Sequence, residues 1–220
     1  MLFHAGVGGI LYAMQLPLFP LPNLVLLPGM VVPLHIFEPR YRELLARVKD
    51  TEEPFGMLHM SPLEDGLEGM ARMSTIGSLA HLIRSETHED GTSTILILGG
   101  ERFKVLEFDE TRYSYLSAEV EMLPLEQTDP EDATVRGADV FERFAQNFPP
   151  DVQVMLRENQ PADTLLQASF VAGNMQLQGD QMQQVLEASD LSERWRVLER
   201  FLPNPNDWQP PADRMLNLFG

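Results

Sequence analysis

Several ionisable side chains cluster in residues 33–45, PLHIFEPRYRELL, which contain His35, Glu38, Arg40 and Tyr41. A histidine near a carboxylate can transfer protons, but catalysis also needs a nucleophile or a group that polarises the substrate. This segment supplies neither at a recognised spacing. We therefore interpret the four residues as a strand-to-helix corner, stabilised by charge-assisted hydrogen bonds of Glu38 and Arg40. The alternative is a contact site for a partner.

Arg102 is grouped with this corner as a structural residue. It follows Gly99 and Gly100, which we expect to form a turn. A partly buried arginine in such a place is expected to reach a carboxylate.

The remaining sequence has no recognised catalytic or ligand-binding motif. It contains no cysteine, and no serine lies in a G-x-S-x-G motif. A serine–lysine dyad has only Lys49 and Lys104 to draw on, and Lys104 is predicted to point outward from a strand. The histidines lack the H-E-x-x-H zinc spacing, and neither glycine-rich phosphate-binding motif occurs. We therefore predict a protein that is not an enzyme, with no catalytic residues, metal site or cofactor.

Charge and composition narrow the possible partners. The formal net charge is -17 and basic residues do not cluster, so nucleic acid is not an expected partner. The apolar stretch 16–37 is long enough to span a membrane, but five prolines would break a helix there, so no membrane segment is expected. Residues 1–13 lack the basic start and cleavage site of a signal peptide. With no cysteine in the chain, this pattern favours a cytoplasmic protein.

The first half of the chain has the pattern of β structure with one helix. Apolar residues at helical spacing, with Pro39 in the first turn, predict a helix over 38–50. Turns are expected at 89–91 and 99–100. Proline spacing and apolar alternation predict extended segments and strands at 24–27, 30–37, 54–60, three places within 75–108, and 115–122.

The second half is predicted to be helical. An acidic, proline-containing segment, 124–133, marks the boundary, and Asp190 has capping-box spacing to Glu193. Helices are expected at about 133–147, 151–157, 163–174, 180–188 and 191–202. We expect four regions: an extension or disordered segment at 1–14, a β domain at 15–124, a helical domain at 133–202 and a proline-rich tail at 203–220. Three apolar residues of the tail are candidates for docking on a surface: Trp208, Leu216 and Phe219.

A family resemblance extends over about residues 15–202. The segment LPLFPLPNLVLLPGMVVPLHIFEPRYRELL strongly resembles the start of the N-terminal substrate-binding domain of Lon proteases. The resemblance continues through IGSLAHLI, DGTSTILILGGERFKV and YLSAEVEML, and it is weaker in the helices, where QMQQVLE departs from the family pattern. It implies an α+β fold, with a PUA-like β pseudo-barrel followed by a C-terminal helical bundle. The ATPase and serine–lysine peptidase domains of full Lon proteases are absent from this sequence, so a stand-alone Lon N-domain protein is expected.

The resemblance, together with the missing catalytic motifs, predicts a non-catalytic module that binds proteins or unfolded polypeptide segments. Flexible methionines suit varied partners, so they are candidate contacts, although filling gaps in the core is the alternative that we favour for them. These methionines are Met57, Met60, Met70 and Met73. Two other functions remain open: RNA or nucleotide binding, because PUA-like barrels occur in RNA-binding proteins, and an unrecognised hydrolase. The acidity of the chain opposes the first.

Overall fold

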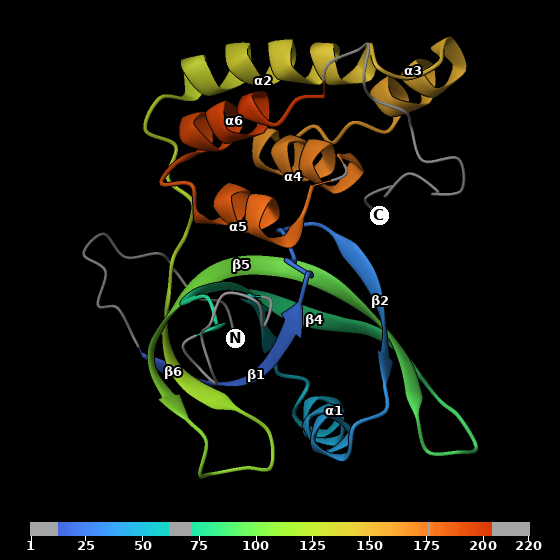
Figure 1. The fold of residues 1–220 in the computed structure, drawn as a ribbon, viewed down its shortest axis with the longest axis vertical. Helices are drawn as coiled ribbons and strands as arrows, with labels where there is room; N and C mark the ends of the chain where they lie inside the picture. The colour runs from blue at the N-terminus through green and yellow to red at the C-terminus, as the bar shows by residue number, and fades with distance from the viewer. Residues whose placement is uncertain (1–12, 62–71, 176, 204–220) are drawn as a thin grey trace.

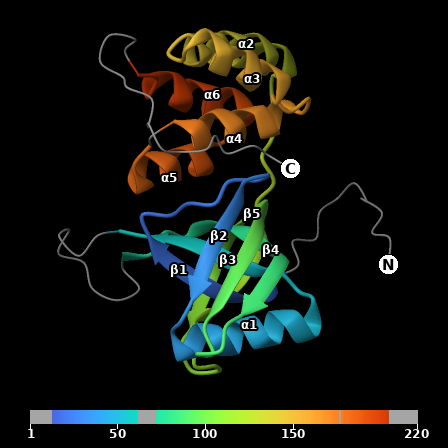
Figure 2. The ribbon, with the colours of Figure 1, turned by 90° about the vertical axis from the view of Figure 1, so that its right-hand side faces the viewer.

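The computed structural model describes residues 13–61, 72–175 and 177–203. The strands of these residues are β1 (Met14–Pro22), β2 (Val31–Ile36), β3 (Phe55–Met60), β4 (Ile76–Thr87), β5 (Ser93–Asp109) and β6 (Ser117–Met122). The helices are α1 (Pro39–Thr51), α2 (Pro130–Ala145), α3 (Pro150–Glu158), α4 (Thr164–Asn174), α5 (Gly179–Glu187) and α6 (Leu191–Arg200). This mixture confirms the predicted α+β class. Figures 1 and 2 show the C-terminal helices at one end of the sheet, with α5 nearest to it, and α1 at the opposite end.

The six strands form one mixed sheet in the order β2-β5-β4-β3-β1-β6. Strand β6 also pairs with β5, so the pairing of β5, β4, β3, β1 and β6 closes a circuit, and β2 is added to β5 outside it. Only β1 and β3 run parallel among these pairs. Bulges interrupt the β4–β5 and β5–β6 pairings, so the circuit is irregular. The PUA-like and helical-bundle descriptions stay predictions.

Strand β1 lies in a proline-rich segment. The extended segment that we predicted at 24–27 is not a strand in the structure. The first half of β1 pairs with β6 and the second half with β3. The N–H of Leu18 donates to the carbonyl of Leu116, on the β6 side (2.8 Å). Because backbone directions alternate along a strand, the nitrogens of Pro20 and Pro22 face that side too, beyond the end of the β6 pairing. The prolines are tolerated because no ladder hydrogen bond is lost.

The expected turn at Gly99 and Gly100 is wrong, since both glycines lie inside the long strand β5. Their lack of side chains serves close packing instead. A Cβ on Gly99 would collide with the backbone carbonyl of Leu27, and a Cβ on Gly100 would lie 2.6 Å from Nε2 of His81. The turn predicted at 89–91 is confirmed by the hydrogen bond from the N–H of Gly91 to the carbonyl of His88 (3.0 Å).

The predicted helices are confirmed with small shifts of their ends. Helix α2 begins at Pro130, three residues before the expected start, because Asp129 caps it by accepting from the N–H of Asp132 (3.0 Å). Asp190 caps α6 as predicted, accepting from the N–H of Glu193 (2.8 Å). None of the helices in the described ranges has the length and hydropathy that a bilayer span requires.

The buried apolar side chains form two clusters. The smaller cluster lies among the strands of the closed circuit: Leu16, Leu18, Leu58, Leu79, Phe103, Val105, Ala118 and Val120. The larger cluster includes residues of α1 and the sheet and also residues of α2, α4, α5 and α6, Trp195 among them. One continuous core therefore joins the β and helical regions, and the boundary at 124–133 does not separate two cores.

Candidate functional site

The predicted corner contains only part of the expected network. Nε of Arg40 donates to Oε2 of Glu38 at 2.9 Å. Both side chains are well exposed, at 51% and 38%, so this ion pair contributes at most about 1 kcal/mol to stability. His35 lies apart from the pair: its ring stacks on Phe37 (6.1 Å between centroids) and lies 6.2 Å from that of His88. The contacts of His35, Glu38 and Arg40 therefore do not pair the histidine with the carboxylate, as proton transfer between them would require.

Tyr41 anchors helix α1 to the core. Its ring is buried, and its centroid lies 4.1 Å from that of the Phe19 ring. The guanidinium of Arg40 lies over the Tyr41 ring, 4.6 Å from the ring centroid. Burial raises the pKa of the Tyr41 hydroxyl above its ordinary value. Tyr41 is thus a packing residue of the corner.

Arg102 lies at the junction between β5 and the helices, not at the corner. Its nitrogens donate to main-chain carbonyls of two segments, so the carboxylate partner expected from the sequence is wrong. The acceptors are Leu123 (3.2 Å), Pro124 (3.3 Å), Leu186 (2.7 Å) and Ala188 (2.7 Å). Burial lowers the pKa of the guanidinium. Sequence alone had no signal that distinguished carbonyl acceptors from a carboxylate.

A second buried arginine supports the same junction. Arg194 of α6 is fully buried, and its Nε donates to the carbonyl of Val185 (3.1 Å). Burial, followed by the nearby charge of Arg102, lowers the pKa of Arg194 to about 9. Both guanidiniums therefore bind carbonyls at the C-terminal end of α5, the negative end of its dipole. Their arrangement is structural.

His59 of β3 is a third buried polar group of this junction. Its side chain is 2% exposed, its Nε2 has no hydrogen-bond partner, and Oδ1 of Asp180 lies 3.9 Å away. Burial lowers the pKa of His59, although the carboxylates of Asp180 and Glu187 act in the opposite direction. The described residues bring no group of three possible metal ligands together.

The three candidate methionines that the structure describes do not form one exposed surface. Met57 is buried in the larger core, so it fills the core, as we favoured, and is not a partner contact. Met60 and Met73 are half-buried and face each other across an isolated β-bridge. Met70 lies outside the described residues.

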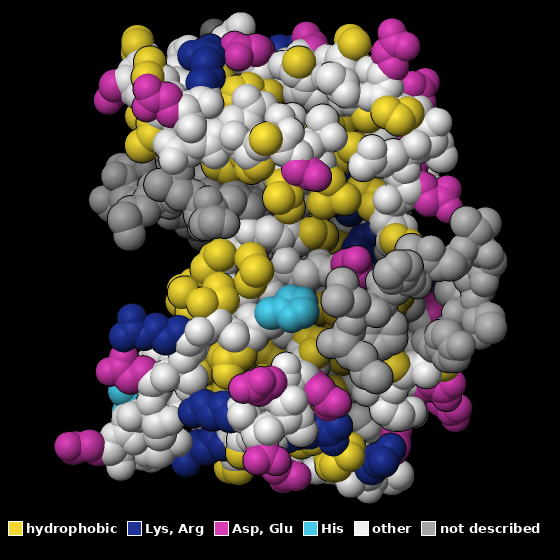
Figure 3. All heavy atoms as spheres, turned by 180° about the vertical axis from the view of Figure 1, so that it is seen from behind, with side chains coloured by type: hydrophobic (Ala, Val, Ile, Leu, Met, Phe, Trp, Pro, Cys, Tyr) yellow, Lys and Arg dark blue, Asp and Glu magenta, His cyan; other side chains and the backbone are white. Residues whose placement is uncertain are grey.

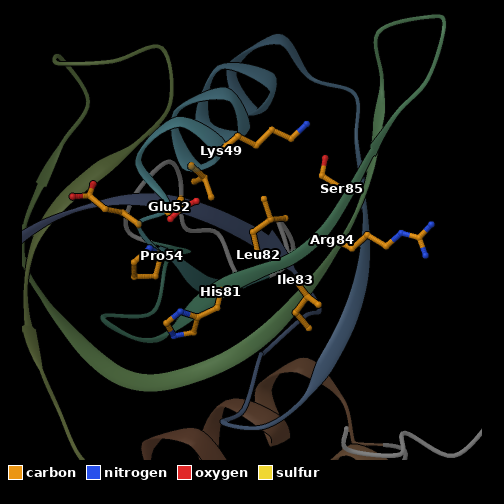
Figure 4. A pocket seen from close by; sticks show the side chains of 10 residues that line it. Lys49, Glu52, Pro54, His81, Leu82, Ile83, Arg84 and Ser85 are labelled. Atoms are coloured by element: carbon orange, nitrogen blue, oxygen red, sulfur yellow. The ribbon is translucent and has the colours of Figure 1, made fainter. Parts of the chain in front are cut away.

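A pocket with a volume of about 380 Å³ lies between the C-terminal end of α1 and β4 (Figure 4). We call it the β4 pocket, and its lining residues are Val48, Lys49, Glu52, Glu53, Pro54, His81, Leu82, Ile83, Arg84 and Ser85. Figure 4 shows Leu82 pointing toward α1, whereas His81 and Ile83 point to the other side of the strand. The pocket therefore combines apolar walls with charges of both signs.

A β-bulge places Ile83 at the surface. Leu82 pairs with Ile97 and Arg84 pairs with Leu96, so Ile83 is the extra residue. Its side chain is 52% exposed, an unusual position for isoleucine. Sequence reasoning missed it, because the run HLIRS shows no alternation that reveals a bulge.

Apolar side chains continue from Ile83 across the outer face of β5 and β2. In β5, Ile95 and Ile97 are buried, so Leu96 and Leu98 occupy the opposite face. The residues of β2 that pair with them share this face. We call the set the outer strip: Val31, Pro33, Ile83, Leu96 and Leu98, none of which belongs to either buried core. Figure 3 shows hydrophobic side chains gathered beside a histidine in the sheet half of the molecule.

Comparison with known proteins shows the family to which this chain belongs. Residues 15–203 match the family described as the ATP-dependent protease La (LON) substrate-binding domain. Lon protease of Dictyoglomus thermophilum is 28% identical over 210 residues, and that of Vibrio parahaemolyticus is 27% identical over 188 residues. These alignments include 92% and 84% of this chain but only 26% and 24% of the relatives. The chain thus spans about a quarter of the length of these curated relatives.

Two solved structures share the fold. One is the crystal structure of a Lon N-terminal domain protein from Xanthomonas campestris, with a TM-score of 0.60, 23% identity, and coverage of 86% of this chain and 99% of that chain. The other is the N-terminal domain of a Mycobacterium avium complex Lon protease, with a TM-score of 0.64, 20% identity, and coverage of 88% and 99%.

Proposed function

Because the chain belongs to the Lon substrate-binding domain family, we propose that it binds segments of other polypeptides without hydrolysing them or ATP. The family match over residues 15–203 is the observation that carries this proposal. The missing P-loop and serine–lysine motifs in the printed sequence support its non-catalytic half. The protein would be a recognition module whose partners are proteins or unfolded segments.

The β4 pocket and the outer strip are the surface that best suits such a partner. Ligand sites combine a concave apolar pocket with a few polar groups that fix orientation, and peptide-binding proteins likewise use pockets for individual side chains. Here Ile83 joins the two features, because it lines the pocket and begins the strip. An apolar side chain of the partner would enter the pocket while its neighbours lie on the strip.

The partner would lie on the face of the sheet rather than extend it as a further strand. Among the described strands, β2 pairs only with β5, so its other edge is free. Pro33 lies in the middle of β2 and has no N–H to donate. Proline at an edge opposes the addition of a strand. Side-chain contacts would therefore supply most of the affinity.

This mode of binding predicts a modest affinity. Ordering an extended segment costs conformational entropy that offsets much of the contact energy, so a Kd in the micromolar range or weaker is expected. Salt should change it little if apolar contacts dominate. Nothing in the described structure favours RNA over polypeptide, and the net charge of -17 opposes RNA.

Finer assignments belong to the same proposal. We take residues 15–124 as a PUA-like β domain, supported by the closed circuit of β5, β4, β3, β1 and β6. Residues 133–202 would form the helical bundle, and the cytoplasm is the proposed location.

The test is a titration of the purified protein into a fluorescein-labelled, permanently unfolded polypeptide such as reduced α-casein, followed by fluorescence anisotropy. Parallel samples measure ATP hydrolysis and casein cleavage on gels. Saturable binding with no turnover is expected. Turnover that persists through purification, or no binding to several unfolded polypeptides, would contradict the proposal.

A further inference from the structure

The β4 pocket and the outer strip also suit a segment of this chain itself. We propose that residues 213–220, DRMLNLFG, dock on this surface and compete with partner polypeptides. The competition rests on the proposed function, whereas the docking does not.

Residues 204–220, which lie outside the described structure, have a composition that suits an apolar surface on an acidic protein. Four of the five residues in MLNLF, 215–219, are large and apolar. The span 204–220 carries two aspartates and one arginine, a net charge of -1 out of the -17 of the chain. An almost neutral apolar segment is repelled little by an acidic protein, so it is able to approach the exposed apolar strip.

Residues 204–220 are long enough to bring the segment 213–220 to this surface. The described chain ends at Pro203, shortly after α6. Seventeen further residues span at most about 60 Å when extended. A compact chain of this size has a radius of gyration of about 17 Å. The nine residues 204–212 by themselves span at most about 30 Å when extended. The segment can therefore reach across the molecule.

The apolar and charged residues of the segment 213–220 match those of the β4 pocket. Ile83 and Leu82 offer apolar contacts, and the rim carries Lys49, Arg84 and Glu52, which form no ion pair with any described residue. The apolar run MLNLF is preceded by Asp213 and Arg214, one charge of each sign. Asp213 is thus complementary to the positive charges at the rim and Arg214 to the negative charge, and both lie next to the apolar run.

The size of the effect follows from effective concentration. A short linker holds a tethered segment at an effective concentration of about 1 mM. If the free segment binds with a Kd of about 100 µM, the tethered one occupies the site about 90% of the time and weakens partner binding about tenfold.

The experiment compares the full chain, a chain that ends at residue 212, and the full chain with Leu216→Ser and Phe219→Ser. Each is titrated against fluorescein-labelled reduced α-casein, and a labelled DRMLNLFG peptide is titrated against the shortened chain. The shortened and doubly substituted chains should bind casein about tenfold more tightly than the full chain. The free peptide should bind the shortened chain and displace casein from it.

Position is tested with two matched substitutions in the shortened chain. Ile83 and Leu106 are both exposed residues of β-bulges, at 52% and 48%, but only Ile83 lines the β4 pocket. Ile83→Asp should weaken binding of the peptide at least tenfold, and Leu106→Asp should leave it unchanged. A scrambled peptide should not bind.

The outcomes separate the two proposals. If casein binds the full and shortened chains equally and the peptide does not bind, the docking is overturned and the proposed function stands. If the peptide binds at Ile83 while casein binds none of the proteins, the docking is supported and the proposed function is contradicted. Peptide binding that Ile83→Asp leaves unchanged would overturn the assigned surface.

Discussion

Arg102 joins the sheet to the helices through a single side chain. It donates to four main-chain carbonyls, two of them, Leu186 and Ala188, at the end of α5. Arg102→Ala would leave these buried acceptors unsatisfied, so the free energy of unfolding should fall by about 3 kcal/mol or more in a urea titration. Lys104→Ala is the control, because Lys104 is an exposed neighbour whose distant ion pair contributes little. Equal losses for both variants would contradict the structural importance of Arg102.

His59 predicts a pH dependence of stability. Burial lowers its pKa in the folded protein below the ordinary value of 6.5, so the unfolded chain binds more protons in that range. The free energy of unfolding should therefore decrease as the pH falls from about 7.5 through about 6.5 toward about 5.5. His59→Gln should flatten this part of the profile. An unchanged profile in His59→Gln would refute the assignment.

Strand β5 depends on two adjacent glycines in different ways. A side chain at Gly99 meets the backbone of Leu27, which cannot move without disturbing the hydrogen bonds between Gly99 and residues 29–30. A side chain at Gly100 meets the far end of the exposed His81 side chain at 2.6 Å and Cβ of Leu79 at 3.2 Å, so rotation of the imidazole would relieve the closest contact. Gly99→Ala should therefore cost about 2 kcal/mol or more, and Gly100→Ala less than about 1 kcal/mol, by thermal or urea denaturation. The reverse order would contradict the packing described for β5.

Local sequence patterns predicted most elements, because capping residues and apolar periodicity act over a few residues. The start of α6 at Asp190 and the helix after Pro39 are examples. Contacts between distant segments were not predictable in this way. Gly99 faces Leu27, Arg102 reaches α5, and the prolines of β1 are accommodated only because its two halves pair with different strands.

The candidate surface was less predictable than the fold. The corner residues and methionines were identified by residue type, but Met57 is buried and the exposed Ile83 arises from a bulge. A bulge depends on the register between two strands, which one strand's sequence does not determine.

At the scale of the whole molecule, the helical region is part of a shared core. Deleting residues 204–220 should lower the free energy of unfolding by no more than about 1.5 kcal/mol, the stabilisation that docking at about 90% occupancy provides, because the described core lies entirely before them. Deleting 190–220 also removes the buried Trp195 and Leu198, so it should abolish cooperative unfolding. Circular dichroism during heating distinguishes the two chains. A cooperative and equally stable transition for the shorter chain would contradict the shared core.

The central claim is that this protein binds polypeptides at the β4 pocket and the outer strip. The most direct measurement is the affinity for labelled unfolded casein of the chain that ends at residue 212, which lacks the competing segment, compared with the affinities of the same chain carrying Ile83→Asp or Leu106→Asp. Both substitutions add a carboxylate at an exposed bulge, so equal denaturation midpoints are expected and serve as the control. The account predicts at least about tenfold weaker binding for Ile83→Asp, equivalent to about 1.4 kcal/mol, and no change for Leu106→Asp. Equal affinities for all three proteins would contradict it.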